Sequence, residues 1–196
     1  MDIPKKFLSD SIPPIFCKFE TAQPFTHCTF CESELGAQSK YAVEKVFKQN
    51  KVVGTSEIVY EYAICWDCTA NMGEDISDDS RTAIMNLFVS HRHQLISKIE
   101  FLHANELYTI DSWTERCSLT GKETRLCDEY SVSGIIEEGG LVFEQSPILV
   151  SDSFMEKLQS VLSKETKEKF DGMRDQILND SPSVEDLIFS PTPGLI

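Results

Sequence analysis

The 196-residue chain is predicted to adopt an α+β fold in which a long helix joins two hairpin-plus-helix units. Two Cys-x-x-Cys pairs flank a segment that resembles a β-hairpin in its strand-forming residues. Residues 78–104 carry apolar side chains at spacings of three and four, which is typical of an amphipathic helix. Residues 129–145 show a second hairpin pattern around the turn sequence Glu137–Gly140. A hydrophobic content of 41% is enough for one large core or two small ones.

The strongest chemical signal is the set Cys28, Cys31, Cys65 and Cys68, in which 33 residues separate the two pairs. A gap of two residues lets a tight turn direct both thiolates at one ion, and two such turns complete the tetrahedron that zinc prefers. The spacing predicts one structural zinc ion bound by these four cysteines.

The segment between the pairs predicts strands at 41–48 and 57–64 around a turn at 49–54, followed by a helix at 66–76. The first cysteine pair precedes this hairpin, and the second lies where its last strand turns into the helix. This order resembles the treble-clef class of zinc fingers over roughly residues 25–75. The resemblance implies a zinc-binding hairpin and helix, and no particular activity.

Two other chemistries remain open for the cysteine pairs. A single Cys-x-x-Cys pair with a lowered thiol pKa acts in redox proteins, although two pairs favour a metal. Rubredoxin-like iron sites use similar turns with a glycine after the second cysteine, where this chain has Glu32 and Thr69. Zinc is therefore the preferred ion.

The remaining thiols and the histidines are predicted to be structural. Cys17 lies in an apolar run and is expected to pack as a small hydrophobic side chain. Cys117 and Cys127 have nine residues between them, which is not the spacing of a metal-binding turn. His91 and His93 cannot share a helix face, so one is expected in the core and one on the surface.

The second half resembles the first, which suggests a tandem duplication. A shift of 89 residues aligns Cys28 with Cys117, Cys31 with Thr120, and Tyr41 with Tyr130. A shorter turn then brings 58–61 near 141–144 and 64–68 near 149–153. Chance similarity between small hairpins is the alternative. On the duplication hypothesis, the second unit has lost three of four ligands.

Helix signals complete the predicted organisation. The residues Ser153-Phe-Met-Glu156 form a capping-box pattern that opens a helix to 162, and a further helix follows to 178. The proline-broken run at 12–19 is expected to be an edge strand or an extended lead-in. The resulting units are a zinc-binding treble-clef-like unit at 1–77, a connecting helix at 78–105, a second unit at 106–180 and a tail at 181–196.

Composition restricts the function classes. The chain carries 32 acidic against 18 basic residues, a net charge of −14, which disfavours binding to nucleic acid phosphates. The chain has no apolar run of about 18 residues, as a membrane span would need, and begins without a signal-peptide pattern. We therefore expect a cytoplasmic protein with no membrane partner.

The function predicted from these observations is a zinc-stabilised acidic module that binds another protein. A sharper form is an inhibitor or immunity protein whose acidic face covers a basic partner. No catalytic motif of serine hydrolases, zinc proteases, phosphate loops or dinucleotide sites occurs, so we do not expect an enzyme. The alternatives are a nucleic-acid-associated zinc-finger regulator and a Cys-x-x-Cys redox protein.

Overall fold

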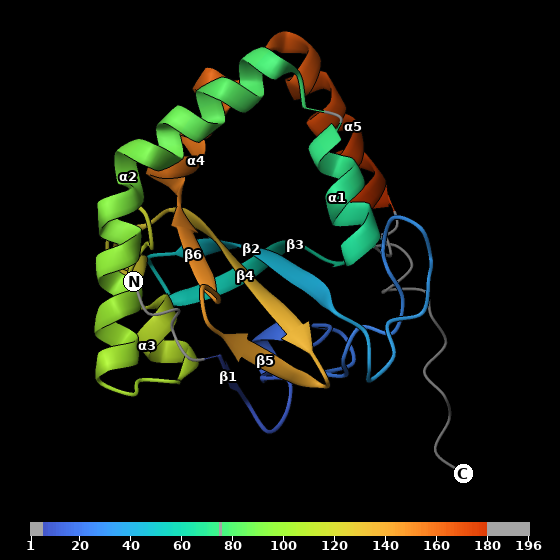
Figure 1. Ribbon diagram of the computed structural model, residues 1–196, viewed down its shortest axis with the longest axis vertical. Coiled ribbons are helices and arrows are strands. Elements are labelled where there is room, and N and C mark those ends of the chain that lie inside the picture. The colour runs from blue at the N-terminus through green and yellow to red at the C-terminus, as the bar shows by residue number, and fades with distance from the viewer. Residues whose placement is uncertain (1–5, 75, 180–196) are drawn as a thin grey trace.

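The computed structural model describes residues 6–74 and 76–179 and has an α+β architecture (Figure 1). An antiparallel sheet has the strand order β1-β5-β4-β2-β3, with β6 also paired to β4. The predicted α+β class with a long helix is confirmed. The strands are β1 (Phe7–Leu8), β2 (Tyr41–Asn50), β3 (Thr55–Cys65), β4 (Glu129–Glu137), β5 (Gly140–Phe143) and β6 (Ile148–Ser151).

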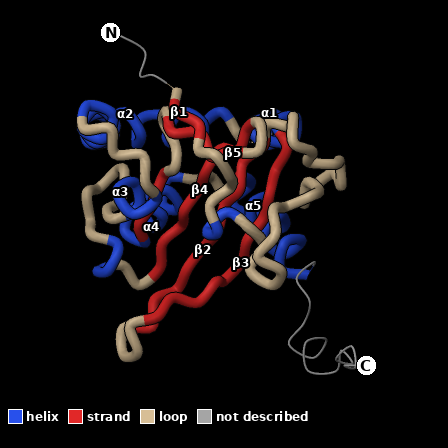
Figure 2. Tube along the Cα trace, turned by 90° about the horizontal axis from the view of Figure 1, so that it is seen from below, coloured by secondary structure: helices blue, strands red, loops and turns tan. Residues whose placement is uncertain are grey.

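Five α-helices cover one side and the rim of the sheet among the described residues (Figures 1 and 2). None of these helices combines the length and apolar character needed to cross a membrane. The predicted tail at 181–196 lies outside the described residues. The helices are α1 (Trp66–Glu74), α2 (Asp78–Ala104), α3 (Ile110–Thr114), α4 (Asp152–Val161) and α5 (Lys164–Asn179).

The first hairpin forms where it was predicted, and its strands are longer. Pairing runs from Tyr41 opposite Cys65 to Asn50 opposite Thr55. The turn is confined to residues 51–54, because the Asn50 side chain accepts hydrogen bonds from two turn amides. Gly54 ends the turn with a φ of 72°, which glycine adopts without strain. The compact turn leaves more residues for pairing at each end.

Strand β4 pairs with the free edge of β2 and makes one continuous sheet from both halves of the chain (Figure 2). Tyr41 lies opposite Ile136, and Lys48 lies opposite Glu129. The sequence had suggested that the helix at 78–104 would mediate packing between the halves. The structure joins them by backbone hydrogen bonds, which satisfy donors and acceptors that an open strand edge would leave exposed. Helix α2 also packs against α4 of the second half, as predicted.

The helix beginnings follow local capping chemistry, with one correction. Ser77 caps α2 by accepting a hydrogen bond from the Ser80 amide at 3.3 Å. The predicted capping box at Ser153 is wrong, because α4 already begins at Asp152. Ser153 lies inside the helix, and its amide donates to the Asp152 carboxylate at 2.6 Å.

The N-terminal proline run is neither a strand nor simply extended. Residues Pro14–Phe16 form a single 3-10 turn, in which Pro14 occupies a position that needs no backbone donor. This turn places Phe16, which is 1% exposed, against the sheet beneath Gly134. A strand at Phe7–Leu8, which the sequence did not predict, pairs with β5.

Gly140 allows this N-terminal strand to approach closely. A Cβ atom built at Gly140 would lie 2.2 Å from the backbone oxygen of Ser9. We expect Gly140→Ala to displace the N-terminal strand and to destabilise the protein by about 1–3 kcal/mol, the usual cost of overpacking. Hydrogen exchange of the Ser9 amide, which donates to Leu141 at 3.0 Å, measures the displacement.

Gly139→Ala is the matched control for overpacking, since a Cβ atom there meets nothing within 4 Å, although its φ of 77° adds strain. The control should leave the Ser9 amide protected. Equal protection of Ser9 in the Gly140→Ala protein would contradict the close approach.

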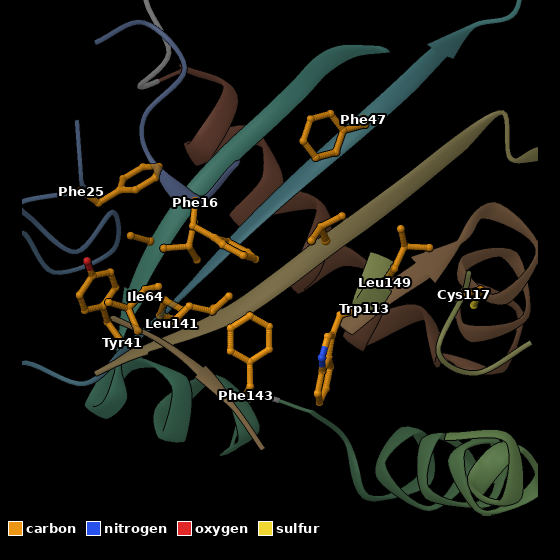
Figure 3. Packing of buried hydrophobic residues seen from close by; sticks show 14 of the residues in the cluster. Phe16, Phe25, Tyr41, Phe47, Ile64, Trp113, Cys117, Leu141, Phe143 and Leu149 are labelled. Carbon is orange, nitrogen blue, oxygen red and sulfur yellow. The ribbon is translucent and has the colours of Figure 1, made fainter. Parts of the chain in front are cut away.

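The main core gathers buried side chains from the sheet, from the N-terminal 3-10 turn and from α3 (Figure 3). Trp113 of α3 is 1% exposed and packs edge-on against Phe143 at 5.5 Å. Its indole nitrogen donates to the Leu107 carbonyl oxygen at 2.7 Å, so its polar group is satisfied inside the core. Trp113 thus anchors the segment between α2 and β4.

The two halves repeat the same strand register. In the first, Tyr41 pairs with Cys65 and Val43 with Ala63. In the second, residues 130 and 132, each 89 positions later, pair with residues 151 and 149, each 86 positions later. The predicted resemblance is therefore present, with two corrections. The alignment after the turn shifts by one residue, and β6 rather than β5 is the counterpart of β3.

The correspondence between the two halves, at a separation of 86 positions, extends to the helices α2 and α5 that follow each unit. Ser77 caps α2 and Ser163 caps α5, and their hydroxyl oxygens lie 3.0 Å apart. The Ser163 amide donates to the Ser80 hydroxyl at 2.8 Å, and the Ser77 amide donates to the Thr166 hydroxyl at 3.2 Å. The helices meet at these caps and diverge, α2 toward α4 and α5 toward β3 (Figure 1). Helix α2 therefore packs against the second half, and helix α5 packs against the first.

Candidate metal centre

The four cysteines of the two pairs come from three adjoining elements. Cys28 and Cys31 lie in the loop 27–34, which an isolated bridge between its end residues closes. Cys65 is the last residue of β3, and Cys68 lies in the first turn of α1. Because β3 continues directly into α1, the second pair lies beside the first.

The structure brings all four sulfur atoms within 4.8 Å of one another. The Sγ atoms of Cys31 and Cys65 are 3.7 Å apart. A tetrahedral zinc ion with Zn–S bonds of about 2.3 Å has sulfurs about 3.8 Å apart, so the Cys31–Cys65 separation is that of two sulfurs on one ion. Among the described residues, this is the group of histidine, cysteine and acidic side chains placed to hold a metal ion.

Backbone and side-chain groups orient these sulfurs. The Cys65 amide donates to the Cys28 sulfur, and the Cys68 amide donates to the Cys65 sulfur, each at 3.4 Å. Thr29 fixes the loop against β3, because its amide donates to the Ala63 carbonyl and its hydroxyl accepts from the Ala63 amide. Groups that orient metal ligands through hydrogen bonds in this way tune the affinity for the metal.

The thiol pKa values of two cysteines in the cluster are shifted in opposite directions. Hydrogen bonds to the exposed Cys31 sulfur lower its pKa to about 6, and the largest contribution comes from the Ser33 hydroxyl 3.1 Å away. Burial raises the pKa of Cys68, which is partly covered. Thiolates rather than thiols bind metals, so the cluster already favours negative charge at one position.

The sequence did not predict the roles of Thr29 and Ser33, since hydroxyl residues next to cysteines carry no spacing signal. The sequence also did not predict the role of Lys40, whose ammonium group lies 4.5 Å from the centre of the Trp66 ring. Trp66 lies between the two cysteines of the second pair and begins α1. The contact stabilises the start of this helix through a cation–π interaction.

The other thiols and histidines lie outside the cluster. Cys17, Cys117 and Cys127 are buried at other places in the fold. His91 is partly buried and meets the Phe154 ring edge-on at 5.1 Å, whereas His93 is exposed. Their placement agrees with the prediction of one core-facing and one surface histidine.

Acidification is expected to release a metal held by this cluster, because protons compete for the thiolates. The pKa of the free Cys31 thiol is lowered from 9.0 to about 6, so its thiolate is available to a metal at neutral pH, and release is expected in the acid range as protons displace the ion. Elemental analysis after dialysis between pH 8 and pH 4 measures the release.

The variant Ser33→Ala is the matched control for this pH dependence. It removes the hydroxyl that lowers the Cys31 pKa, so its release should occur at higher pH than in the parent protein. Identical release curves would show that the Ser33 hydroxyl does not influence release, and loss of metal on raising the pH would contradict proton competition for the thiolates.

Comparisons with models of known protein families, with curated proteins and with solved structures gave no match to this chain.

Proposed function

We propose that this chain is a zinc-stabilised acidic protein whose function is to bind another protein. The observation that carries the proposal is the cluster of four cysteine sulfurs within 4.8 Å. Four thiolates fill the coordination shell of zinc, which is the pattern of a structural ion rather than a catalytic one. A non-catalytic role in the cytoplasm is part of the proposal, since zinc thiolates persist in a reducing compartment.

The order of elements around the cluster supports a treble-clef-like unit. A cysteine loop at 27–34 is followed by the β2–β3 hairpin, and α1 carries the fourth cysteine. Such a unit is too small to bury a large core, so a metal ion would supply much of its folding free energy.

The surface of α2 supports the protein-binding part of the proposal. Met85 and Val89 are each 63% exposed and lie one helical turn apart, and Phe101 is 61% exposed farther along the helix. Exposed apolar neighbours such as Met85 and Val89 are common at protein contacts, whereas Phe101 lies about 120° around the helix from Val89 and does not share their face. Asp78 and Asp79 in the first turn add negative charge at the same helix.

The net charge indicates the chemistry of the partner. A charge of −14 repels nucleic acid and attracts a basic protein surface, as an inhibitor or immunity protein would require. The acidic side chains on α5 are solvent-exposed, and several have nearby basic partners. Four acidic and four basic residues balance on α5, so the net negative charge of the chain comes from other segments.

The proposal predicts an association that weakens steeply with salt, because exposed charges are screened within a Debye length of about 8–10 Å at 0.1–0.15 M ionic strength. Proteins retained at low salt by the immobilised chain should be eluted at physiological salt. Met85→Ser combined with Val89→Ser should reduce their retention if α2 is the contact.

The matched control changes Val52 and Val53 to serine, since these residues are also exposed and lie at the tip of the β2–β3 hairpin. This control should retain the partner. Tight binding of DNA by the purified chain at physiological salt would overturn the protein-binding proposal and favour the nucleic-acid alternative.

A further inference from the structure

The loop at 116–123 repeats the hydrogen bonds of the cysteine loop at 27–34. Each loop is closed by a bridge between its first and last residues, and in each the second residue is a cysteine. The sixth residue of each loop, Glu32 in the first and Gly121 in the second, has a positive φ. The matched pairs are Cys28 N–Ser33 O and Cys117 N–Lys122 O, both 2.8 Å, and Glu32 N–Cys28 O at 2.9 Å and Gly121 N–Cys117 O at 3.0 Å.

Both loops are attached to their strands by the same two bonds. Thr29 donates its amide to the Ala63 carbonyl at 2.9 Å and accepts from the Ala63 amide at 3.2 Å. Ser118 donates its amide to the Leu149 carbonyl at 2.8 Å and accepts from the Leu149 amide at 3.3 Å. The hydroxyl residue after the first cysteine therefore attaches the loop to a strand in the same way in each half.

The first sulfur of each loop accepts the same hydrogen bond. The Cys28 sulfur accepts from the Cys65 amide at 3.4 Å, and the Cys117 sulfur accepts from the Ser151 amide at 3.4 Å. Ser151 ends β6 just as Cys65 ends β3, and a helix begins at the next residue in both. The backbone that supports the metal centre thus occurs twice in the fold.

The positions of the other three cysteines are occupied differently in the second half. Thr120 corresponds to Cys31 and Ser151 to Cys65, and their hydroxyl oxygens lie 3.2 Å apart where the two sulfurs lie 3.7 Å apart. Hydroxyl groups are poor zinc ligands compared with thiolates. The pair forms a hydrogen bond in place of two bonds to a metal.

Phe154 occupies the position of Cys68. Its ring is 1% exposed and packs edge-on against Phe88 at 5.4 Å and His91 at 5.1 Å, both from α2. An aromatic ring offers no metal ligand and fills space that an ion and a fourth sulfur would need. Apolar packing therefore replaces coordination at this position.

We infer that Cys117, Thr120, Ser151 and Phe154 mark a second metal site that has lost its metal. A hydrogen bond between two hydroxyl groups and the packing of an aromatic ring now stabilise this part of the fold in place of the ion. The inference takes the proposed zinc site of the first half as its template. It assigns no metal to the second half of the natural chain, and it holds that the supporting backbone has remained competent to bind one.

The test restores the ligands in the full chain. The triple variant T120C/S151C/F154C should bind one more zinc ion per chain than its parent when both are purified in parallel with a thiol reductant. Cobalt substitution should add the absorption of a second tetrahedral thiolate site. Adding C117S to the triple variant should remove the extra ion, since Cys117 is the one ligand that the second half has kept.

Because Phe154→Cys removes a buried ring and can destabilise the core, a second variant tests metal binding with a ring kept at this position. T120C/S151C/F154H keeps a ring of similar shape and supplies three cysteines and one histidine, which is also a zinc ligand set. A gain of one zinc in either variant supports the inference, including a gain that restores a fold which is missing without metal. No gain in either variant, folded or not, overturns it.

The comparison with the parent separates this inference from the proposed function. If the parent holds no zinc and the triple variant holds one, the proposed first site fails while the second is upheld. If the parent holds one zinc and the variants still hold one, the first site stands and the inference fails.

Discussion

Replacing Cys65 by serine is expected to abolish metal binding and to unfold the first half of the chain. Cys65 supplies one of four sulfurs and lies at the junction where β3 becomes α1. A structural zinc ion contributes folding free energy on the order of 10 kcal/mol, which is as large as the total stability of a typical domain. Metal analysis and far-ultraviolet circular dichroism of the purified variant measure the two losses.

Serine at Cys17 and at Cys127 provides the matched control. Both thiols are buried at a distance from the cluster, so the substitution is chemically the same and spares the ligands. These variants should retain the full zinc content. A Cys65→Ser protein with unchanged zinc and an unchanged melting temperature would contradict the role assigned to the cluster.

The second large effect is expected for Trp113→Ala, with a loss of about 3–5 kcal/mol in the free energy of unfolding, as is usual when a buried aromatic ring is removed. Trp113 is 1% exposed and contacts both Phe143 and His103, with ring centres 5.5 and 5.7 Å away. Its loss leaves the Leu107 carbonyl without its indole donor. Urea denaturation followed by circular dichroism measures the change.

The other tryptophan of the chain serves as the control for this prediction. Trp66 is 48% exposed and has the Lys40 ammonium over its ring. Trp66→Ala should therefore cost only about 0.5–1 kcal/mol, the value of an exposed cation–π contact. A similar loss of unfolding free energy for both substitutions would contradict the assignment of Trp113 to the core.

Local patterns were sufficient to predict the elements that local chemistry determines. The β2–β3 hairpin follows from β-branched and aromatic residues on either side of a turn, and α2 follows from its helical spacing of apolar residues. The four cysteines were identified because ligand spacing within a turn is a local property. The structure then brings together the residues that the spacing had grouped.

Contacts between distant segments could not be read from the same patterns. The pairing of β2 with β4 joins residues that are more than 80 positions apart, and an edge strand has no sequence signal for its partner. The two-residue strand β1 is too short to show alternation, and its position depends on the absence of a side chain at Gly140.

The alignment of the two halves failed by one residue for a similar reason. Sequence similarity placed Cys68 beside Ser153, whereas the strand register makes Phe154 its counterpart. Cysteine and phenylalanine share no chemistry, so only the backbone positions reveal that they are equivalent. Phe154 could therefore not be recognised from the sequence as the residue that replaces a ligand.

X-ray absorption at the zinc edge of the purified, natural chain identifies the ligands of the ion. We expect one zinc ion per chain with four sulfur neighbours at about 2.3 Å. A spectrum with fewer than four sulfurs, with nitrogen or oxygen ligands in their place, or from a chain that contains no zinc would contradict this expectation.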